Sequence, residues 1–330
     1  MRGQPHFSVI IPVYNRASVL GTAIRSVLAQ TCQDFEIVIV DDGSQDDPAP
    51  VAAAFGDPRI RLLRQENQGG GAARNAAIDA ARGRFIAPLD SDDVFLPHHL
   101  ATMKALLDGT TNIAGYARIL VDRGEGRTFL KPPRAIREGE DMGEYLLCRR
   151  GFVPTITLVV ERQMAHRVGY HADLRAAEDT DFAIRLAEAG CKFVMAPEAG
   201  AVWKDQADPG RTSAGAASSR TQRFALWLEQ MKPRMTGRAW QGARGWGYAK
   251  MLSRDGQKWQ ALKLYLSAVA NKCYAPRLAA IIFLQIFLGT ETYRRLADTA
   301  IGWLRLNLRE PEPAGRRTQS SLQYPRRSLR

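Results

Sequence analysis

Hydrophobic residues in the first 110 positions follow two alternating spacings. Continuous apolar runs rich in β-branched residues predict four strands, at 7–11, 35–40, 59–63 and 84–89. Between them, apolar residues three and four positions apart predict helices over 17–30 and 70–83, the second closed by Gly83. Strands that alternate with helices in short units predict an α/β domain with a mostly parallel sheet and right-handed crossovers.

The pattern changes along the rest of the chain. Residues 111–205 mix strand-like and helical stretches, of which 177–190 is the firmest helix. Strand signals stop near residue 218, and four helices are predicted beyond it, over 220–231, 246–272, 275–289 and 292–308. The last twenty residues are rich in Pro, Ser and Arg, which predicts a disordered tail. We therefore divide the chain into an α/β domain, a helical region and a tail, over 1–217, 218–310 and 311–330.

Charge is distributed unevenly along the chain. The net charge is +12, yet residues 231–330 hold 19 Lys and Arg against 5 Asp and Glu, a balance of +14. A basic region of this kind suits an acidic partner, either an anionic phospholipid leaflet or nucleic acid. The 45% apolar and 24% charged content is that of an ordinary globular protein.

Cysteine spacing and the N-terminal sequence indicate the cellular compartment in which the protein works. The four cysteines lie far apart without a CxxC pair, which argues against a zinc site or a disulfide framework and suits a reducing compartment. The apolar run before Pro12 is too short for a signal peptide. We expect a cytoplasmic protein, with peripheral attachment to the inner face of the cytoplasmic membrane left open.

Polar clusters follow four of the predicted elements. They are PVYNR at 12–16, DDGS at 41–44, NQGGGAARN at 67–75 and DSDD at 90–93. Ligands of open α/β sheets sit beyond the carboxyl ends of the parallel strands. We therefore expect the four clusters to line one crevice.

The carboxylates at 90–93 raise an electrostatic problem. Two carboxylates about 4 Å apart repel by about 4 kcal/mol at an effective dielectric near 20. A hard divalent ion such as Mg²⁺ or Mn²⁺ relieves that repulsion, because it takes carboxylate and phosphate oxygens as ligands. The spacing of Asp90 and Asp92 lets both side chains leave an extended strand end on the same side. Plain helix-capping aspartates are the alternative.

Each remaining cluster has two interpretations. Asp41 and Asp42 form either an Asx-turn that opens a helix, with Ser44 as the helix cap, or a ligand site. The glycines at 69–71 with Arg74 make either a flexible helix start or an anion cradle of backbone N–H groups. The acids at 178–179 either cap a helix or supply an ionised base. The first strand–helix turn lacks GxGxxG, which disfavours a dinucleotide site.

In order and spacing, these segments resemble the family 2 nucleotide-sugar glycosyltransferases, which have a GT-A fold. The resemblance covers residues 6–215 and is carried by SVIIPVYNR, FEIVIVDDGSQD, NQGGGAARNAA, FIAPLDSDD and AEDTDFAIRL. It implies that the first turn flanks the nucleotide through Pro12, Tyr14 and Arg16. It also implies that Asp41 or Asp42 hydrogen-bonds the base, most often uracil, and that Arg74 contacts the nucleotide or its diphosphate.

The resemblance implies the chemistry as well. Asp90 would approach the ribose, Asp92 would bind the Mn²⁺ or Mg²⁺ that bridges the diphosphate, and Asp179 would be the base of an inverting transfer. The donor would be a nucleotide-diphosphate sugar, most often a UDP-sugar, and the acceptor a saccharide or lipid-linked saccharide. Residues in and after the base helix are candidates for acceptor or diphosphate contact: Glu178, Trp203, Lys204 and Arg211.

One motif of the family is missing from this chain, and its absence narrows the reaction that we expect. The QxxRW motif of processive members is not met, because Gln222 and Arg223 are adjacent and Trp227 lies further on. We therefore expect an enzyme that adds one sugar at a time, as in the synthesis of cell-surface polysaccharides. The rival enzyme class is a nucleotidyltransferase or nucleotide-sugar pyrophosphorylase. Such enzymes need a Gly-rich signature near the first strand, and the segment IPVYNRAS does not supply one. A nucleic-acid-binding protein would leave the acidic clusters unexplained, so no nucleic-acid partner is expected.

The apolar run at 278–288 has two interpretations. Eleven helical residues span about 16 Å, short of the roughly 30 Å hydrocarbon layer. A buried helix of a small bundle is favoured. The alternative is an interfacial helix with Arg277, Arg294 and Arg295 at its ends, held against an anionic leaflet.

Overall fold

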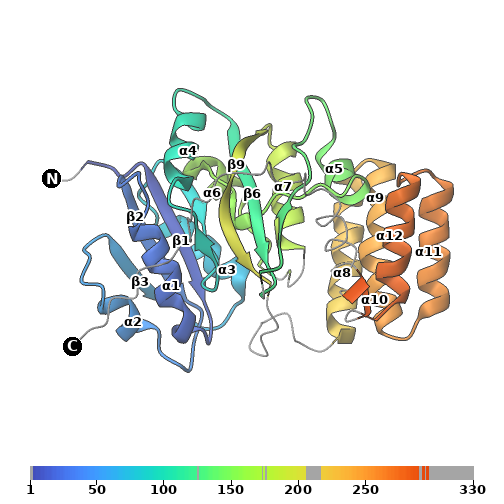
Figure 1. Cartoon of the computed structure of the whole chain (residues 1–330), viewed down its shortest axis with the longest axis horizontal. Helices are drawn as coiled ribbons and strands as arrows, with labels where there is room; N and C mark the ends of the chain where they lie inside the picture. Colours follow the sequence, from blue (N-terminus) through green and yellow to red (C-terminus); the bar gives the residue numbers. More distant parts are fainter. Residues whose placement is uncertain are drawn as a thin grey trace, which may run out of the picture. The chain divides into compact units, whose positions relative to one another are not determined.

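The computed structural model describes residues 3–124, 126–172, 174, 177–205, 217–289, 292–293 and 295–296. Residues Met1–Phe287 form one compact unit that holds two sheets and a set of helices (Figure 1). Helices of the basic region therefore pack within the same unit as the sheets. The division into an α/β domain and a helical region at residue 217 stays a prediction.

The first sheet is the predicted parallel one. Its strand order is β3-β2-β1-β4-β8, and the strands are β1 (Phe7–Val13), β2 (Phe35–Asp41), β3 (Ile60–Arg64), β4 (Phe85–Pro88) and β8 (Val160–Glu161). The first four pair in parallel and β8 pairs antiparallel with β4. The four predicted strands are confirmed, each to within a few residues.

Helices cover both faces of this sheet, which explains why β1 and β2 are apolar almost throughout. Val9 and Ile11 pack with Leu20 and Ile24 of α1 (Ala17–Leu28). Ile10, on the opposite face of β1, packs in a second cluster that includes α3 (Gly70–Ala80). Successive residues of a strand point to opposite faces, so a strand covered on both sides is apolar at nearly every position.

A second, four-stranded sheet went unpredicted. Its order is β5-β9-β6-β7, and its strands are β5 (Val94–Phe95), β6 (Ile113–Asp122), β7 (Thr128–Lys131) and β9 (Lys192–Lys204). The long pair β6 and β9 runs in parallel with shifts of register around Tyr116 and Arg118. These irregularities, together with Pro197 and Gly200 inside β9, interrupt the alternation that identifies a strand in sequence.

Helices follow from the middle of the chain to its basic part. They are α2 (Ala49–Ala53), α4 (His99–Leu107), α5 (Met142–Cys148), α6 (Arg162–Val168), α7 (Glu178–Glu188), α8 (Ala217–Met231), α9 (Gly237–Ala243), α10 (Ala249–Arg254), α11 (Lys258–Ala270) and α12 (Pro276–Phe287). The prediction of one helix over 246–272 is wrong. Gly256 adopts a φ of +84°, which a helix cannot contain, so the chain breaks between α10 and α11.

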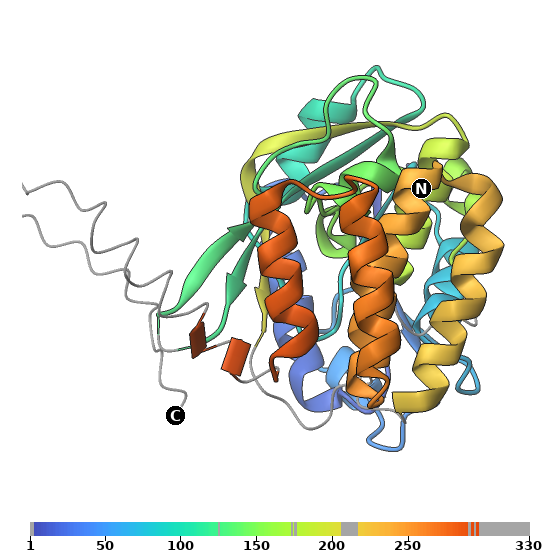
Figure 2. The ribbon, with the colours of Figure 1, turned by 90° about the vertical axis from the view of Figure 1, so that its right-hand side faces the viewer.

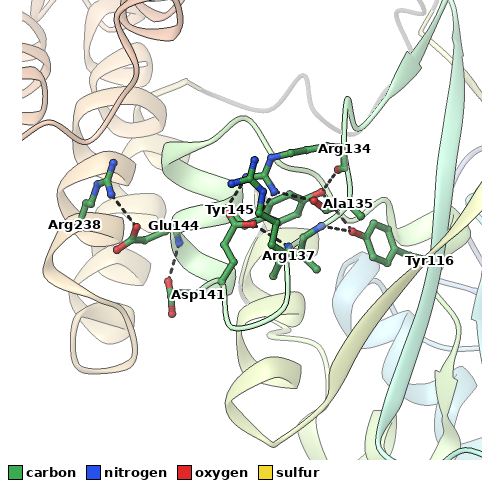
Figure 3. Close-up of polar contacts among 10 residues, drawn as sticks. Tyr116, Arg134, Ala135, Arg137, Asp141, Glu144, Tyr145 and Arg238 are labelled. Atoms are coloured by element: carbon green, nitrogen blue, oxygen red, sulfur yellow. Dashed lines mark hydrogen bonds and ion pairs between the residues drawn. The ribbon is translucent and has the colours of Figure 1, made fainter.

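A polar network joins the second sheet to the helical part (Figure 3). The hydroxyl of Tyr116 on β6 accepts the backbone N–H of Ile136 at 3.0 Å, and that of Tyr145 on α5 donates to the carbonyl of Arg134 at 2.7 Å. From the same helix, Glu144 accepts from Arg238 of α9 at 3.2 Å. The loop before α5 is thereby fixed between β6 and the helices that follow.

The last two described helices lie side by side (Figure 2). The ring of Tyr265 on α11 contacts that of Phe283 on α12, with centroids 5.6 Å apart. No helix within the described part of the chain is both long and apolar enough to cross a membrane.

Gly83 yields a stability prediction. It does not close α3, which ends at Ala80; a Cβ at Gly83 would instead lie 2.6 Å from backbone atoms of Phe7 and Ser8. We expect Gly83→Ala to lower the free energy of unfolding by about 1–3 kcal/mol, because β1 must move to admit the methyl group. Chemical denaturation measures this. Gly237→Ala, whose Cβ would meet nothing within 4 Å, is the matched control, and equal losses in the two variants would contradict the packing.

Candidate functional site

The carboxyl ends of β1, β2 and β4 meet at one edge of the first sheet. Val13 of β1 is paired with Asp41 of β2, and the N–H of Asp42 donates to the carbonyl of Val13 at 2.9 Å. Leu89, just after β4, donates its N–H to the carbonyl of Ile10 at 2.9 Å. The turns at 12–16, 41–44 and 90–93 are therefore neighbours, as the sequence predicts.

A pocket of about 470 Å³ opens at this edge. That volume is in the range of small-molecule sites. Nine of the predicted residues line it: Pro12, Tyr14, Arg16, Asp42, Arg74, Asp90, Asp92, Glu178 and Trp203. The expectation of one crevice is confirmed. Sequence reasoning had named no role for three further polar lining residues, Asn67, Ser91 and Asp93, although all of them belong to the clusters it identified.

Arg74 connects two parts of this pocket that lie far apart in sequence. Its guanidinium donates to Asp90 at 2.6 Å and to Glu178 at 2.6 Å, across 16 and 104 residues. Burial acts to lower the pKa of Arg74, but the two carboxylates outweigh it and raise the pKa above its usual value. Arg74 is therefore a fixed cation that fastens the start of α7 to the end of β4.

Asp42 occupies the glycine-rich turn. Its carboxylate accepts the backbone N–H groups of Gln68 at 2.9 Å and Gly69 at 2.8 Å, and the side chain of Gln65 at 2.7 Å. One N–H group of the predicted anion cradle at 69–71, that of Gly69, thus holds a carboxylate of the protein itself. Gly69 has a φ of +97°, which explains a glycine at this position.

The neighbouring Asp41 stabilises the turn that follows β2. Its side chain accepts the N–H of Ser44 at 2.8 Å, which forms the Asx-turn, and it is buried outside the pocket lining. The hydroxyl of Ser44 accepts the N–H of Asn15 at 2.9 Å instead of capping α2. Of the two aspartates considered for the base, the pocket contains Asp42.

The three carboxylates of the DSDD turn differ in exposure and in hydrogen bonding. Asp90 and Asp92 have side chains 36% and 25% exposed, and Asp92 contacts Arg16 at 3.1 Å. Asp93 is buried and accepts the backbone N–H of Lys204 at 3.0 Å. That bond ties the end of β9 to the turn.

The implied metal fits these donors. Mg²⁺ and Mn²⁺ take hard oxygen ligands and are commonly held by one or two carboxylates together with substrate phosphates. Asp90 and Asp92 are two partly exposed carboxylates on the wall of one pocket. Among the described residues, no group of three or more His, Cys, Asp or Glu side chains is placed to hold an ion without such a substrate.

Asp179 lies at the first turn of α7, beside the pocket and not on its lining. The hydroxyl of Thr155, which sequence reasoning missed, donates to its carboxylate at 2.6 Å. Burial raises the pKa of Asp179, although the Thr155 hydrogen bond and Arg74 act against it. Burial likewise raises the pKa of Glu178, against the opposing effect of Arg74. Both acids are therefore stronger bases than free carboxylates, contrary to the expectation that the helix start keeps Asp179 readily ionised.

The remaining candidates are Trp203, Lys204 and Arg211. Trp203 lines the pocket, and the ammonium of Lys131 on β7 lies 5.1 Å from the centre of its indole ring. The side chain of Lys204 is not among the lining groups. Arg211 falls outside the described residues.

A second hollow of about 520 Å³ lies between α6, α7 and residues 232–234. Its lining includes Arg185 and Arg234, but these pair with Asp181 and Glu188. Asp181 is also the acceptor for the buried indole N–H of Trp227, at 2.8 Å. These groups are used in packing α7 against α8, so the pocket at the strand ends is the better candidate site.

The raised pKa of Asp179 predicts an unusual effect on stability. A folded-state pKa above the unfolded value means that the native state binds more protons, so stability falls as pH rises from about 4. Asp179→Asn removes this penalty while keeping an oxygen for Thr155. We expect the variant to have a higher melting temperature than wild type at pH 7, and the gain to shrink as the pH approaches 4.

Differential scanning fluorimetry over a pH series checks this expectation. Asp79→Asn changes an exposed carboxylate of α3 and should shift the melting temperature little at any pH. A destabilised Asp179→Asn at pH 7 would contradict the raised pKa.

Comparison with known proteins identifies the family of the chain. A model described as Glycosyl transferase family 2 matches residues 8–161, and one described as Glycosyl transferase family group 2 matches residues 85–290. The amylovoran biosynthesis glycosyltransferase AmsB of Erwinia amylovora is 28% identical over 266 residues, which are 77% of this chain and 87% of AmsB. An uncharacterized glycosyltransferase of Rickettsia felis is 31% identical over 189 residues, or 55% of this chain, which spans only 31% of that longer protein.

A solved structure supports the fold. The crystal structure of S. aureus TarS 1–349 in complex with UDP-GlcNAc superposes with a TM-score of 0.60 at 17% identity, covering 90% of this chain and 92% of TarS 1–349. A match at this low identity bears on the fold alone. The superposition confirms the predicted GT-A-like architecture with its added helices. The second family match covers more than half of the chain. The chain belongs to glycosyl transferase family group 2.

Proposed function

We propose that this protein is an inverting glycosyltransferase. It moves one sugar from a nucleotide-diphosphate donor to a hydroxyl of a saccharide or lipid-linked saccharide, in the synthesis of a surface polysaccharide. The observation that carries the proposal is the single pocket in which three strand-end turns and the start of α7 meet. Family membership favours this reaction over nucleotidyl transfer or nucleic-acid binding.

The donor side uses the turns of β1, β2 and β4. Pro12, Tyr14 and Arg16 flank the nucleotide, Asp42 faces the base, and Asp90 approaches the ribose. A UDP-sugar is the favoured donor, in line with the UDP-GlcNAc bound to TarS. Arg74 acts from its place between Asp90 and Glu178, holding both acids toward the donor.

Asp92 is the residue that would hold Mn²⁺ or Mg²⁺, with Asp90 beside it. When bound, such an ion supplies positive charge to the departing diphosphate. Arg16 contacts Asp92 at 3.1 Å, so its guanidinium would face the same phosphates when a donor binds.

Asp179 is the proposed base. It takes the proton of the acceptor hydroxyl while that oxygen bonds to the anomeric carbon, and the bond from this carbon to the diphosphate oxygen breaks. Attack opposite the leaving group inverts the configuration, and no covalent enzyme intermediate is needed. A raised pKa suits this task, because a base works best when its pKa lies near the working pH. Glu178 is less suited, since Arg74 already binds its carboxylate.

The acceptor side is proposed at the pocket mouth. Trp203 offers a flat apolar surface for a sugar ring, and Lys204 and Arg211 follow it in sequence. Transfer of one sugar per encounter agrees with the unmet QxxRW motif. We also propose a cytoplasmic enzyme with peripheral contact to an anionic leaflet, where a lipid-linked acceptor would be found.

Donor binding tests the metal site. We expect one member of a sugar-nucleotide panel to raise the melting temperature of the protein in the presence of Mn²⁺ and much less without it. Asp92→Asn should remove this metal-dependent shift, because it removes a carboxylate ligand. Asp108→Asn, an exposed carboxylate of the loop after α4, is the control. A full shift in Asp92→Asn would exclude Asp92 as the ligand.

Transfer kinetics distinguish the two acids of α7. Asp179→Asn should keep the donor-induced thermal shift but lower the turnover number by roughly 10²–10⁴-fold, since it removes the base. Glu178→Gln should mainly weaken donor binding, because it loosens Arg74. The reverse assignment, with normal turnover in Asp179→Asn and none in Glu178→Gln, would make Glu178 the base.

A further inference from the structure

Large apolar side chains are exposed together on α11 and α12. Trp259 is 78% exposed and Leu266 53% exposed on α11, and Phe283 and Leu284 are 42% and 41% exposed on α12. Val269 is also exposed. We call these five residues the apolar face. On α11, Trp259, Leu266 and Val269 lie seven and three positions apart, so they share one side of the helix. Clustered exposed apolar side chains mark an interaction site.

The apolar face does not result from poor packing of α11 and α12. Each helix has a separate buried side, formed by small and aliphatic residues such as Ala261 and Ala268 of α11 and Ile282 and Ile286 of α12. The ring of Phe283 contacts that of the buried Tyr265 on α11, so Phe283 packs directly against the neighbouring helix. Figure 2 shows the two helices running next to one another.

Charge along α11 and α12 has one sign. From Gly256 to Thr290 the sequence contains no Asp or Glu, while Lys258, Lys263, Lys272 and Arg277 lie within the stretch and are exposed. Lys263 lies one turn from both Trp259 and Leu266, so the basic and apolar groups share one side of α11. Long basic side chains can extend along apolar surface and place their charges among acidic headgroups.

Exposed apolar side chains together with basic side chains favour one kind of binding partner over the others. In a two-fold dimer the same patch meets itself, so the lysines would face lysines without any carboxylate to balance them. A nucleic acid would neutralise the lysines but would leave the aliphatic side chains without a partner. An anionic phospholipid leaflet satisfies both, because headgroups meet the cations while Trp and Leu enter the interface.

We propose that the apolar face is a membrane-docking surface for anionic phospholipid. It lays α11 and α12 along the leaflet, with Trp259 at the headgroup level. α12 has 12 residues and is about 18 Å long, which suits a helix lying in the interface. This inference deepens the proposed lipid-linked acceptor, but its test measures binding and needs neither donor nor acceptor.

Sedimentation with vesicles tests the proposal on the full chain. Wild type should bind vesicles of phosphatidylcholine mixed with phosphatidylglycerol far better than vesicles of phosphatidylcholine alone. The double variant Trp259→Gln/Leu266→Gln should bind the mixed vesicles at least about tenfold more weakly, since it removes two apolar side chains that enter the interface. Lys263→Gln/Lys272→Gln should also weaken binding, and added salt should reduce the difference from wild type.

Leu226→Gln is the matched control, because Leu226 is 64% exposed on α8 and lies outside the apolar face. It should bind as wild type does. All five substituted side chains are exposed, and unchanged melting temperatures would show that the variants fold. Equal binding of the double variant and wild type would overturn the proposal. So would absent vesicle binding by wild type, or a wild-type dimer that the double variant converts to monomer in light scattering.

Discussion

The ion pairs of Arg74 are the constraint on which the site depends. A buried guanidinium binds one acid from the end of β4 and another from the start of α7, each at 2.6 Å. Without a cation, Asp90, Glu178 and Asp179 would repel one another in a partly buried pocket, where such repulsion is far stronger than in water. Arg74 thus allows the chain to gather acids at the place where a phosphate-bearing substrate and its counter-ion are expected.

Each acid in the pocket then has a distinct environment. Asp42 and Asp93 are buried and accept backbone N–H groups, so they shape the loops around the ligand. Asp90 and Asp92 stay partly exposed beside arginines. Asp179 is half-buried with one hydroxyl donor, and its pKa is raised. The proposed division of roles into loop structure, donor contact and proton transfer rests on these differences in solvation, more than on the number of acids.

The sequence predicted the first sheet and the shared pocket well, because both depend on local patterns. Strands covered on two faces are apolar throughout, and the polar turns follow them directly. The second sheet could not be predicted, since β9 contains Pro197 and Gly200 and its alternation is broken. Nor could the partners of Arg74, because Glu178 lies 104 residues away in the sequence and only the tertiary fold brings it close. The occupant of the glycine-rich turn was missed for the same reason, because Asp42 comes from another strand.

Diffraction from crystals grown with UDP and Mn²⁺ tests the central claim most directly, since manganese can be located by its anomalous scattering. The account predicts an ion bonded to Asp92 and to the diphosphate, with the uracil next to Asp42 and Arg74 still between Asp90 and Glu178. Nucleotide bound elsewhere on the protein, or manganese bound without contact to Asp92, would contradict it.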